Sequence, residues 1–295
     1  MELIATRMEP KQPLLDNREQ TEAGYEMIGQ IGSGGYGYVY LLRNLRAASE
    51  EEGYLAGKFI YRRIFGPSED PASDAAYRRA LEGLQNFRSV LGESPYLLRV
   101  FDLRERHDQG YFCYMMELAD DLRSGRRIDP RAYQPRTLKN ELEHEGIRRR
   151  LPAARCAQTA TMLARGLAIL HEAGFTHRDV RPSNIIFVNA VPKLADIDLL
   201  AGHDPSLPSY IPRHYAAPEG GHSRQADLFS FGKTLYEMCT GNAVKEFPAL
   251  PGDIRHWDDH QLVLRLNKII GKACARDPRK RYASAEQMLK ELENI

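Results

Sequence analysis

Three glycines in the stretch QIGSGGYGYVYLL, residues 30–42, follow the spacing G-x-G-x-x-G, with Gly32, Gly34 and Gly37 at the fixed positions. Glycines at this spacing let a backbone approach phosphate groups closely, and two different nucleotide-binding designs use them. In a dinucleotide fold a helix leaves the glycines, but here residues 38–42 are aromatic and β-branched residues typical of a strand. The stretch therefore indicates a glycine hairpin, which either covers the phosphates of a nucleotide or is a flexible turn without a ligand.

The elements around this hairpin divide the chain into three parts. Residues 1–22 are polar, contain two prolines and are expected to form a leader outside the fold. Residues 23–118 combine strand patterns with one amphipathic helix, whereas residues 119–295 carry long helical patterns, so the predicted class is α+β with two lobes. Strands are expected over 25–31, 36–42, 55–60, 96–103 and 111–118, and helices over 74–91, 137–146, 154–174, 226–239 and 261–275.

The composition argues against several classes of function. The 295 residues include 41 Lys plus Arg and 40 Asp plus Glu, and a net charge of +1 gives no general argument for binding nucleic acid or an anionic membrane. The chain has four widely separated cysteines and no C-x-x-C pair, so neither a zinc site nor a disulfide framework is expected, and a cytoplasmic location fits best. Without a signal-peptide core or a run of about 18 apolar residues, the chain is expected to be soluble.

A set of motifs downstream of the glycine hairpin carries a resemblance to a known family. HRDVRPSNIIF, residues 177–187, is followed by KLADIDLL, residues 193–200, and by AAPE, residues 216–219. Together with the AGK that ends at Lys58, they stand in the order of the protein-kinase signature set. Over about residues 24–292 the chain resembles the eukaryotic-like (Hanks-type) protein kinases, most nearly the bacterial serine/threonine protein kinases. The resemblance implies a two-lobed protein-kinase-like fold, with an antiparallel sheet and one long helix in the N-lobe and a mainly helical C-lobe.

The resemblance also implies that ATP and Mg²⁺ bind between the lobes. Lys58 would contact the α- and β-phosphates, and Glu82, the only glutamate well inside the predicted helix, would hold its ammonium group. Asn86 stands where the family has an apolar residue, so Gln85 or a rotated helix is the alternative. Met116 would guard the back of the adenine pocket. The other nucleotide contacts implied by the resemblance are Ile31, Gly32, Gly34, Gly37, Val39, Ala56, Glu117, Ala119, Ile186 and Asp196.

The catalytic set that the resemblance implies is Asp179, Lys58, Arg181 and Asn184. Asp179 would accept or orient the proton of the incoming hydroxyl group, while Asn184 and Asp196 would bind the Mg²⁺ that bridges the phosphates. Arg181 stands where serine/threonine kinases usually carry lysine and would keep a positive charge near the γ-phosphate. The implied activity is the transfer of this phosphate to serine or threonine hydroxyl groups of a protein substrate.

Departures from the family pattern keep other functions open. Asp198 replaces the glycine of Asp-Phe-Gly, and the resulting Asp-x-Asp also resembles small-molecule kinases of the aminoglycoside and choline kinase type. Pro212 stands where serine/threonine kinases have Thr and tyrosine kinases have proline, so a tyrosine-directed kinase is an alternative. The departures also motivate a nucleotide-binding pseudokinase that acts as a scaffold. The protein kinases differ from the small-molecule kinases in a set of charged residues that this chain has: Glu219, Asp227 and Arg281.

Two further segments bear on partners and regulation. Residues 120–138, DDLRSGRRIDPRAYQPRTL, form a long connection rich in Arg and Pro, which predicts either a docking loop or a tolerated insertion. Ser206, Ser209 and Tyr210 are candidate phosphorylation sites in the activation segment. Regulation by phosphorylation there, with self-association for autophosphorylation, is an expectation of the resemblance.

Overall fold

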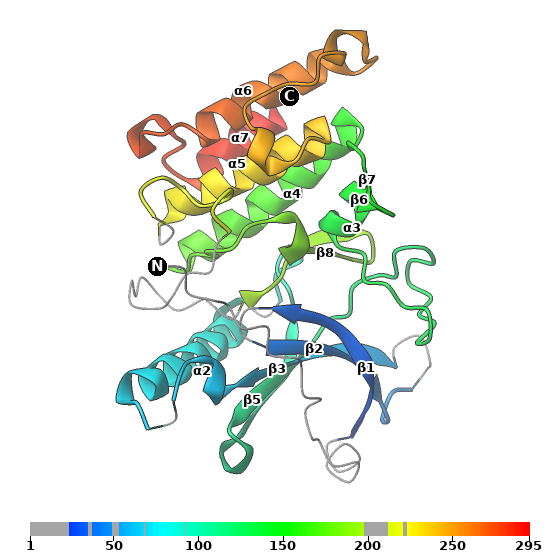
Figure 1. Ribbon diagram of the computed structural model, residues 1–295, viewed down its shortest axis with the longest axis vertical. Helices are drawn as coiled ribbons and strands as arrows, with labels where there is room; N and C mark the ends of the chain where they lie inside the picture. Colours follow the sequence, from blue (N-terminus) through cyan, green and yellow to red (C-terminus); the bar gives the residue numbers. More distant parts are fainter. Residues whose placement is uncertain are drawn as a thin grey trace.

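The two lobes are visible in a computed structural model of the chain. It describes residues 24–34, 37–48, 53–67, 69–91, 93–197, 212–220 and 223–295. One lobe is built on a β-sheet and the other from helices, and the lobes lie one above the other (Figure 1). The predicted α+β class is therefore confirmed. The expected leader, residues 1–22, lies outside the described residues. Within the described ranges, no helix combines the length and the apolar character that a membrane span requires.

Five antiparallel strands make the sheet of the N-lobe, in the spatial order β1-β2-β3-β5-β4. Aromatic and β-branched residues are frequent in them, as expected for half-buried pleated strands. The strand predicted over 96–103 begins later, because Leu98 donates its backbone N–H to the carbonyl oxygen of Leu194 in the C-lobe at 3.0 Å. The strands are β1 (Tyr25–Gly34), β2 (Gly37–Asn44), β3 (Tyr54–Tyr61), β4 (Val100–Arg106) and β5 (Tyr111–Met116).

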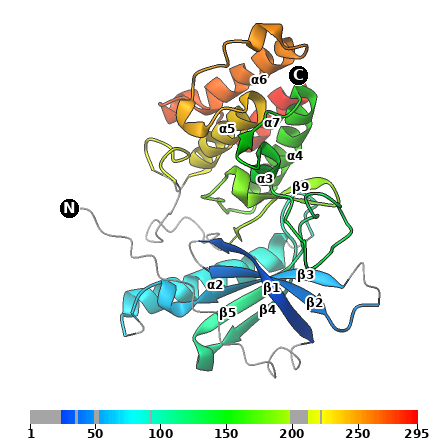
Figure 2. The same ribbon diagram turned by 45° about the vertical axis from the view of Figure 1, so that its right-hand side comes forward.

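One long helix, α2 (Pro71–Leu91), packs against this sheet (Figures 1 and 2). The side chain of Asp70 accepts hydrogen bonds from the backbone N–H groups of Ala72 and Ser73 and so caps the first turn. An apolar stripe at helical spacing predicts the face that meets the sheet. Every residue of that predicted stripe is buried: Ala76, Ala80, Leu84, Phe87 and Leu91.

The C-lobe is mainly helical, with short hairpins at the side that faces the sheet (Figure 1). Nearly all of α5 is buried, so this helix is the centre of the lobe. The helices are α3 (Leu138–Leu142), α4 (Ala153–Glu172), α5 (Arg224–Thr240), α6 (His260–Ala273) and α7 (Ala285–Glu293), and the hairpins are β6 (Glu143–His144) with β7 (Ile147–Arg148) and β8 (Ile185–Val188) with β9 (Val191–Leu194).

The helix expected over 137–146 is only half formed. It ends at Leu142, and the β6–β7 hairpin takes the place of its second half. The turn of this hairpin has two positive φ angles, 53° at Glu145 and 77° at Gly146, which suit a tight hairpin and not a helix. A tertiary contact holds the hairpin, since Arg148 donates from Nη2 to Oε1 of Glu237 at 2.6 Å. The local helical pattern is overridden by this contact.

A single apolar cluster runs through both lobes. It includes Leu84 and Phe112 in the N-lobe and Leu167 and Phe231 in the C-lobe, all fully or almost fully buried. A smaller cluster around Phe59 covers the opposite face of the sheet. Because the main cluster is continuous, the residues at the junction of the lobes are held in place from both sides.

Candidate active site

β1 and β2 form the predicted glycine hairpin, with Gly34 paired to Gly37 at its end. At Gly37 a Cβ atom would lie 2.0 Å from the carbonyl oxygen of Phe59, so only glycine fits there. A Cβ atom at Gly34 would lie 3.7 Å from Nζ of Lys58 and 3.8 Å from Oδ2 of Asp196. The hairpin prediction is confirmed, and the end of the hairpin lies beside two charged groups.

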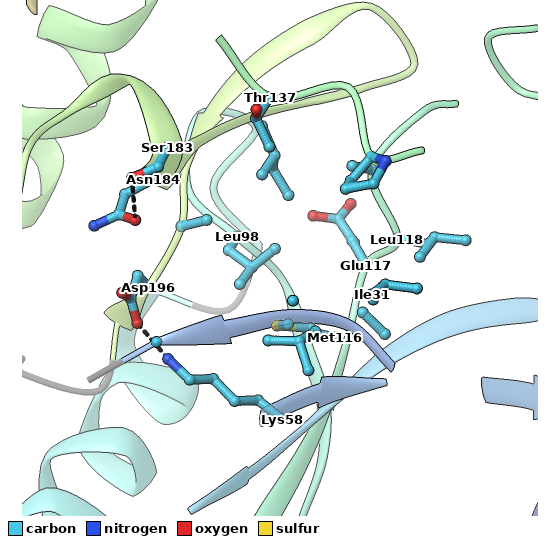
Figure 3. Close-up of a pocket in the computed structure, with 18 of the residues that line it drawn as sticks. Ile31, Lys58, Leu98, Met116, Glu117, Leu118, Thr137, Ser183, Asn184 and Asp196 are labelled. Atoms are coloured by element: carbon cyan, nitrogen blue, oxygen red, sulfur yellow. Dashed lines mark hydrogen bonds and ion pairs between the residues drawn. The ribbon is translucent and has the colours of Figure 1, made fainter. Parts of the chain in front are cut away.

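Lys58 and Asp196 face each other across the junction of the lobes and form an ion pair (Figure 3). Lys58 comes from β3, and its side chain is only 4% exposed. Asp196 follows β9 and has a φ of 64°, a left-handed conformation that few residues with side chains adopt. Backbone strain of this kind is concentrated at functional sites, where the surrounding structure maintains it.

Glu82 does not hold Lys58 in this structure. Among the described residues no ion pair joins the two, because Glu82 lies on the exposed side of α2. The rotation of the helix is fixed by its apolar face, on which Leu81 and Leu84 are buried. The alternative, Gln85, is exposed as well. The predicted Lys58–Glu82 contact is therefore wrong, and the ammonium group has a carboxylate from the C-lobe as its partner.

Replacement of Glu82 by Gln is expected to change the kcat and the KM for ATP by less than about twofold, as for other exposed side chains. Lys58→Met, measured in the same assay, should raise the KM for ATP clearly, since it removes a buried cation. A large loss of activity in Glu82→Gln would show that α2 turns this carboxylate toward Lys58 in the working state.

Asp179 and Asn184 are joined by hydrogen bonds in the loop between α4 and β8. Nδ2 of Asn184 donates to Oδ2 of Asp179 at 2.7 Å and to its backbone carbonyl oxygen at 3.0 Å. Arg181 donates from Nε to the same carboxylate oxygen at 2.9 Å. The other oxygen, Oδ1, is buried and also lies 2.9 Å from Nε of Arg181, but no described residue donates a hydrogen bond to it. An oxygen in this condition can accept a proton from a substrate hydroxyl group.

This loop is fixed by Asp227 of α5. The Asp227 carboxylate accepts the backbone N–H groups of His177 and Arg178, both at 2.7 Å, and lies 2.9 Å from Nε2 of His171. All four residues are buried. Arg178 has a φ of 68°, so the carboxylate stabilises a backbone conformation that such a residue rarely adopts. The position of the adjacent Asp179 depends on this arrangement.

A cavity of about 170 Å³ lies at these groups, between the sheet and the C-lobe (Figure 3). The structure brings most of the predicted nucleotide contacts together in its lining: Ile31, Gly32, Gly34, Val39, Ala56, Lys58, Met116, Glu117, Ala119, Asn184, Ile186 and Asp196. Four predicted site residues are not part of the lining: Gly37, Glu82, Asp179 and Arg181. Asp179 and Arg181 lie next to it, through their contacts with Asn184 and with each other.

The lining also contains residues that the sequence does not single out. Some are apolar neighbours of predicted site residues, such as Leu118 and Ala195, and their position follows from the adjacent predicted residues. Tyr133, Pro135 and Thr137 come from the segment 120–138. Nothing in the sequence predicts that this segment returns to the cavity.

The connection between the lobes is held by Glu117 and Lys193. The ammonium group of Lys193 lies 2.8 Å and 2.7 Å from the two carboxylate oxygens of Glu117, and one of these oxygens also accepts the backbone N–H of Arg99 at 2.9 Å. Two residues later, Ala119 is 5% exposed, yet no described residue accepts a hydrogen bond from its backbone N–H. Because buried backbone N–H groups are nearly always paired, this one indicates a ligand position.

The protein kinase domain model matches residues 25–292. The chain belongs to the protein kinase family. A probable serine/threonine-protein kinase of Clostridium perfringens is 25% identical to this kinase domain over 295 residues, which cover 92% of this chain and 38% of the relative. A Wee1-like protein kinase of Arabidopsis thaliana is 31% identical over 142 residues, which cover 42% of this chain and 27% of the relative. The chain thus spans less than half the length of these relatives.

The crystal structure of the Mycobacterium tuberculosis PknI kinase domain has the same fold. It aligns with a TM-score of 0.62 at 20% sequence identity, covering 92% of this chain and 95% of that one. The two-lobed protein-kinase-like fold expected from the motifs is therefore confirmed. The resemblance to bacterial Hanks-type kinases is confirmed as well, because relatives from Clostridium and Streptomyces are named serine/threonine-protein kinases.

In this kinase domain, Glu219 and Arg281 form the ion pair expected for the family. Two parallel hydrogen bonds join them, at 2.6 Å from Nη1 to Oε1 and at 2.8 Å from Nη2 to Oε2. The Arg281 side chain has no exposure and also donates to the carbonyl oxygen of Ala275 at 2.7 Å. The pair anchors the segment 212–220 to the C-lobe. Other residues of interest lie outside the described ranges: Asp198, Ser206, Ser209 and Tyr210.

Proposed function

We propose that the chain binds Mg-ATP between its lobes and transfers the γ-phosphate to serine or threonine hydroxyl groups of proteins. In this proposal residues 23–118 form the nucleotide-binding lobe, and residues 119–295 form the catalytic and substrate-binding lobe. The observation that carries it is that Lys58, Asn184 and Asp196 line one cavity, and that Asp179 lies next to this cavity in contact with Asn184. The names of the bacterial relatives support the choice of serine and threonine.

Each of these four groups has a role in phosphoryl transfer, where catalysis consists mainly of positioning and of neutralising charge. Lys58 supplies a cation for the phosphates beside the glycine hairpin. Asn184 and Asp196 supply oxygen ligands for a metal, and Asp179 supplies the base. The apolar lining residues above the cavity receive the adenine ring, and the backbone groups of Glu117 and Ala119 bind its edge.

The side chains fit the divalent metal that the family implies. Carboxylate and amide oxygens are the ligands that Mg²⁺ prefers, and Asp196 and Asn184 bring both kinds to the cavity. The two hydrogen bonds that Asn184 donates to Asp179 use its amide nitrogen. Its oxygen accepts one hydrogen bond, from the Ser183 hydroxyl group at 3.2 Å, and keeps a second lone pair for a metal. When bound, the metal would neutralise charge on the phosphates.

Asp179 acts as the base through Oδ1, the carboxylate oxygen to which no described residue donates a hydrogen bond. Burial raises the pKa of Asp179 above its ordinary value, and the nearby Arg181 guanidinium offsets part of this effect. A raised pKa strengthens a carboxylate as a proton acceptor, provided that the pH remains high enough to keep it ionised. Arg181 thereby adjusts the proton affinity of the base in addition to bringing positive charge to the site.

The activity is expected to fall as the pH is lowered, because Asp179 becomes protonated and can no longer act as a base. Since its pKa is raised, this fall should occur at a higher pH than for an ordinary aspartate. Arg181→Gln removes the charge that lowers the pKa of Asp179, so the acidic limb of the profile of kcat/KM against pH should move to higher pH. Arg127→Gln, an exposed arginine of the segment 120–138, is the control and should leave the limb in place. An unchanged limb in Arg181→Gln would contradict the coupling.

The experiment that tests the proposed function is phosphate transfer from γ-labelled ATP, with Mg²⁺, to generic protein substrates, followed by identification of the labelled residues. Label on serine and threonine supports the proposal. Label on tyrosine, for which Pro212 gives a reason, would assign the chain to the tyrosine-directed kinases. Label only on small alcohols would make it a small-molecule kinase, and nucleotide binding without any label would make it a pseudokinase. Autophosphorylation at Ser206, Ser209 or Tyr210 in the same assay would support regulation through these residues.

A further inference from the structure

The carboxylate of Asp121 makes several of the hydrogen bonds that shape the segment 120–138. Oδ1 of Asp121 accepts the backbone N–H groups of Arg123 at 2.9 Å and Ser124 at 2.8 Å, and Oδ2 accepts that of Gln134 at 2.8 Å. Asp121 is 5% exposed. Burial alone would raise the pKa of Asp121, but these hydrogen bonds outweigh burial and lower it. These hydrogen bonds join the two ends of the segment, residues 121–124 and residue 134.

This conformation brings Tyr133 back to the connection between the lobes. The Tyr133 hydroxyl group donates a hydrogen bond to the carbonyl oxygen of Ala119 at 3.0 Å. Its side chain lines the nucleotide cavity together with Pro135. Burial raises the pKa of Tyr133, so the hydroxyl group stays protonated and remains a donor at neutral pH.

The two backbone groups of Ala119 are thus in different situations. No described residue accepts from its N–H, whereas its carbonyl oxygen already has a donor within the chain. In an extended backbone, the N–H and C=O of one residue point to the same side and can bind neighbouring atoms of one partner. Consider a flat ring with one atom that accepts a hydrogen bond from this N–H. The neighbouring ring atom then lies toward the Ala119 carbonyl oxygen, which already accepts a hydrogen bond from Tyr133.

We infer that Tyr133 is a specificity-determining residue of the nucleotide pocket. It selects purines that have no donor at the 2-position, the edge position that lies toward the Ala119 carbonyl oxygen when the adjacent ring nitrogen N1 accepts from the Ala119 N–H. The inference rests on the proposed function, since it takes the ligand to be a purine nucleotide. Adenine has only a hydrogen at its 2-position and leaves the Tyr133–Ala119 hydrogen bond intact. A 2-aminopurine has an additional donor at this position, which has to compete with the phenol for the carbonyl oxygen and for space.

The experiment compares the dissociation constants of ATP and 2-amino-ATP, measured by calorimetry with Mg²⁺ on the full chain and on Tyr133→Phe. In the original chain 2-amino-ATP should bind no more tightly than ATP. Phe keeps the ring but frees the carbonyl oxygen, so Tyr133→Phe should improve the binding of 2-amino-ATP relative to ATP by about three- to tenfold, the effect of one net hydrogen bond. Tyr54→Phe, in a neighbouring cavity, is the control and should leave the ratio unchanged.

The outcomes separate this inference from the proposed function. If both nucleotides bind and Tyr133→Phe leaves their ratio unchanged, the inference is overturned while nucleotide binding stands. If 2-amino-ATP already binds the original chain severalfold more tightly than ATP, the carbonyl oxygen is accessible and the inference is overturned as well. If neither nucleotide binds, both the proposed function and the inference fail. A melting temperature of Tyr133→Phe close to that of the original chain confirms that the fold is kept.

Discussion

Asp179→Asn is expected to lower kcat by about 10²- to 10⁴-fold, the range found when a general base is removed. Asn has the same shape and can still accept the hydrogen bonds from Asn184 and Arg181 through its oxygen, but it cannot take up a proton. The dissociation constant for ATP should therefore change little. Single-turnover transfer of labelled phosphate gives the rate, and calorimetric titration with ATP gives the binding.

The control for this prediction is Asp108→Asn. Asp108 is an exposed aspartate on the short turn between β4 and β5, and it does not line the cavity. Its replacement should leave kcat unchanged. A kcat within about tenfold of the original in Asp179→Asn would mean that the hydroxyl proton leaves by another route and that Asp179 only orients the substrate.

Glu219→Gln is expected to lower the free energy of unfolding by about 2 kcal/mol, between the ranges for exposed and for buried ion pairs, because the Glu219 side chain is 33% exposed. The reason is that Arg281, with no exposure, keeps its charge and loses its only carboxylate partner among the described residues. Burial acts to raise the pKa of Glu219, but the hydrogen bonds from Arg281 lower it overall. This contribution to stability is therefore present at neutral pH and is lost as the pH falls through that lowered pKa.

Urea unfolding of the variants gives the measurement. The double variant Glu219→Gln/Arg281→Met has no buried charge at this contact. Its loss of unfolding free energy should therefore be smaller than the sum of the losses in the two single variants. The exposed pair Arg165–Glu293, with its atoms 2.9 Å apart, is the control, and Glu293→Gln should cost less than about 1 kcal/mol. Equal losses at the two pairs would show that burial does not decide the strength of the Glu219–Arg281 contact.

The parts of the fold that were predictable from the sequence are those with strong local patterns. The glycine hairpin follows from Gly37 and the strand-forming residues after it, since a side chain at Gly37 has no room and the exit pattern excludes a helix. Every residue predicted for the apolar stripe of α2 is buried. Apolar residues at helical spacing lie on one face of the helix, and this face packs against the sheet. Asn184 and Asp196 line one cavity, and it was the resemblance to the protein kinases, not a local pattern, that implied their meeting.

What could not be predicted depends on contacts between distant residues. The sequence shows a glutamate within α2, but the direction of Glu82 depends on the rotation of the helix, which the packing of Leu81 and Leu84 decides. The helix expected over 137–146 stops at Leu142 because Arg148 has a partner in Glu237, almost ninety positions later. Tyr133 gives no signal at all, since its role exists only once Asp121 has folded the segment around itself.

The way in which Asp227 supports the catalytic loop links activity to the cooperativity of the C-lobe. The carboxylate is on α5, the most buried helix of the lobe, and the loop has its strained backbone only while this helix is folded. The loop and α5 thus form one cooperative unit, which opens only when much of the lobe opens. Substitutions in α5 that lower the stability of this unit would reduce the fraction of active molecules, even if they lie far from the nucleotide and alter none of its contacts.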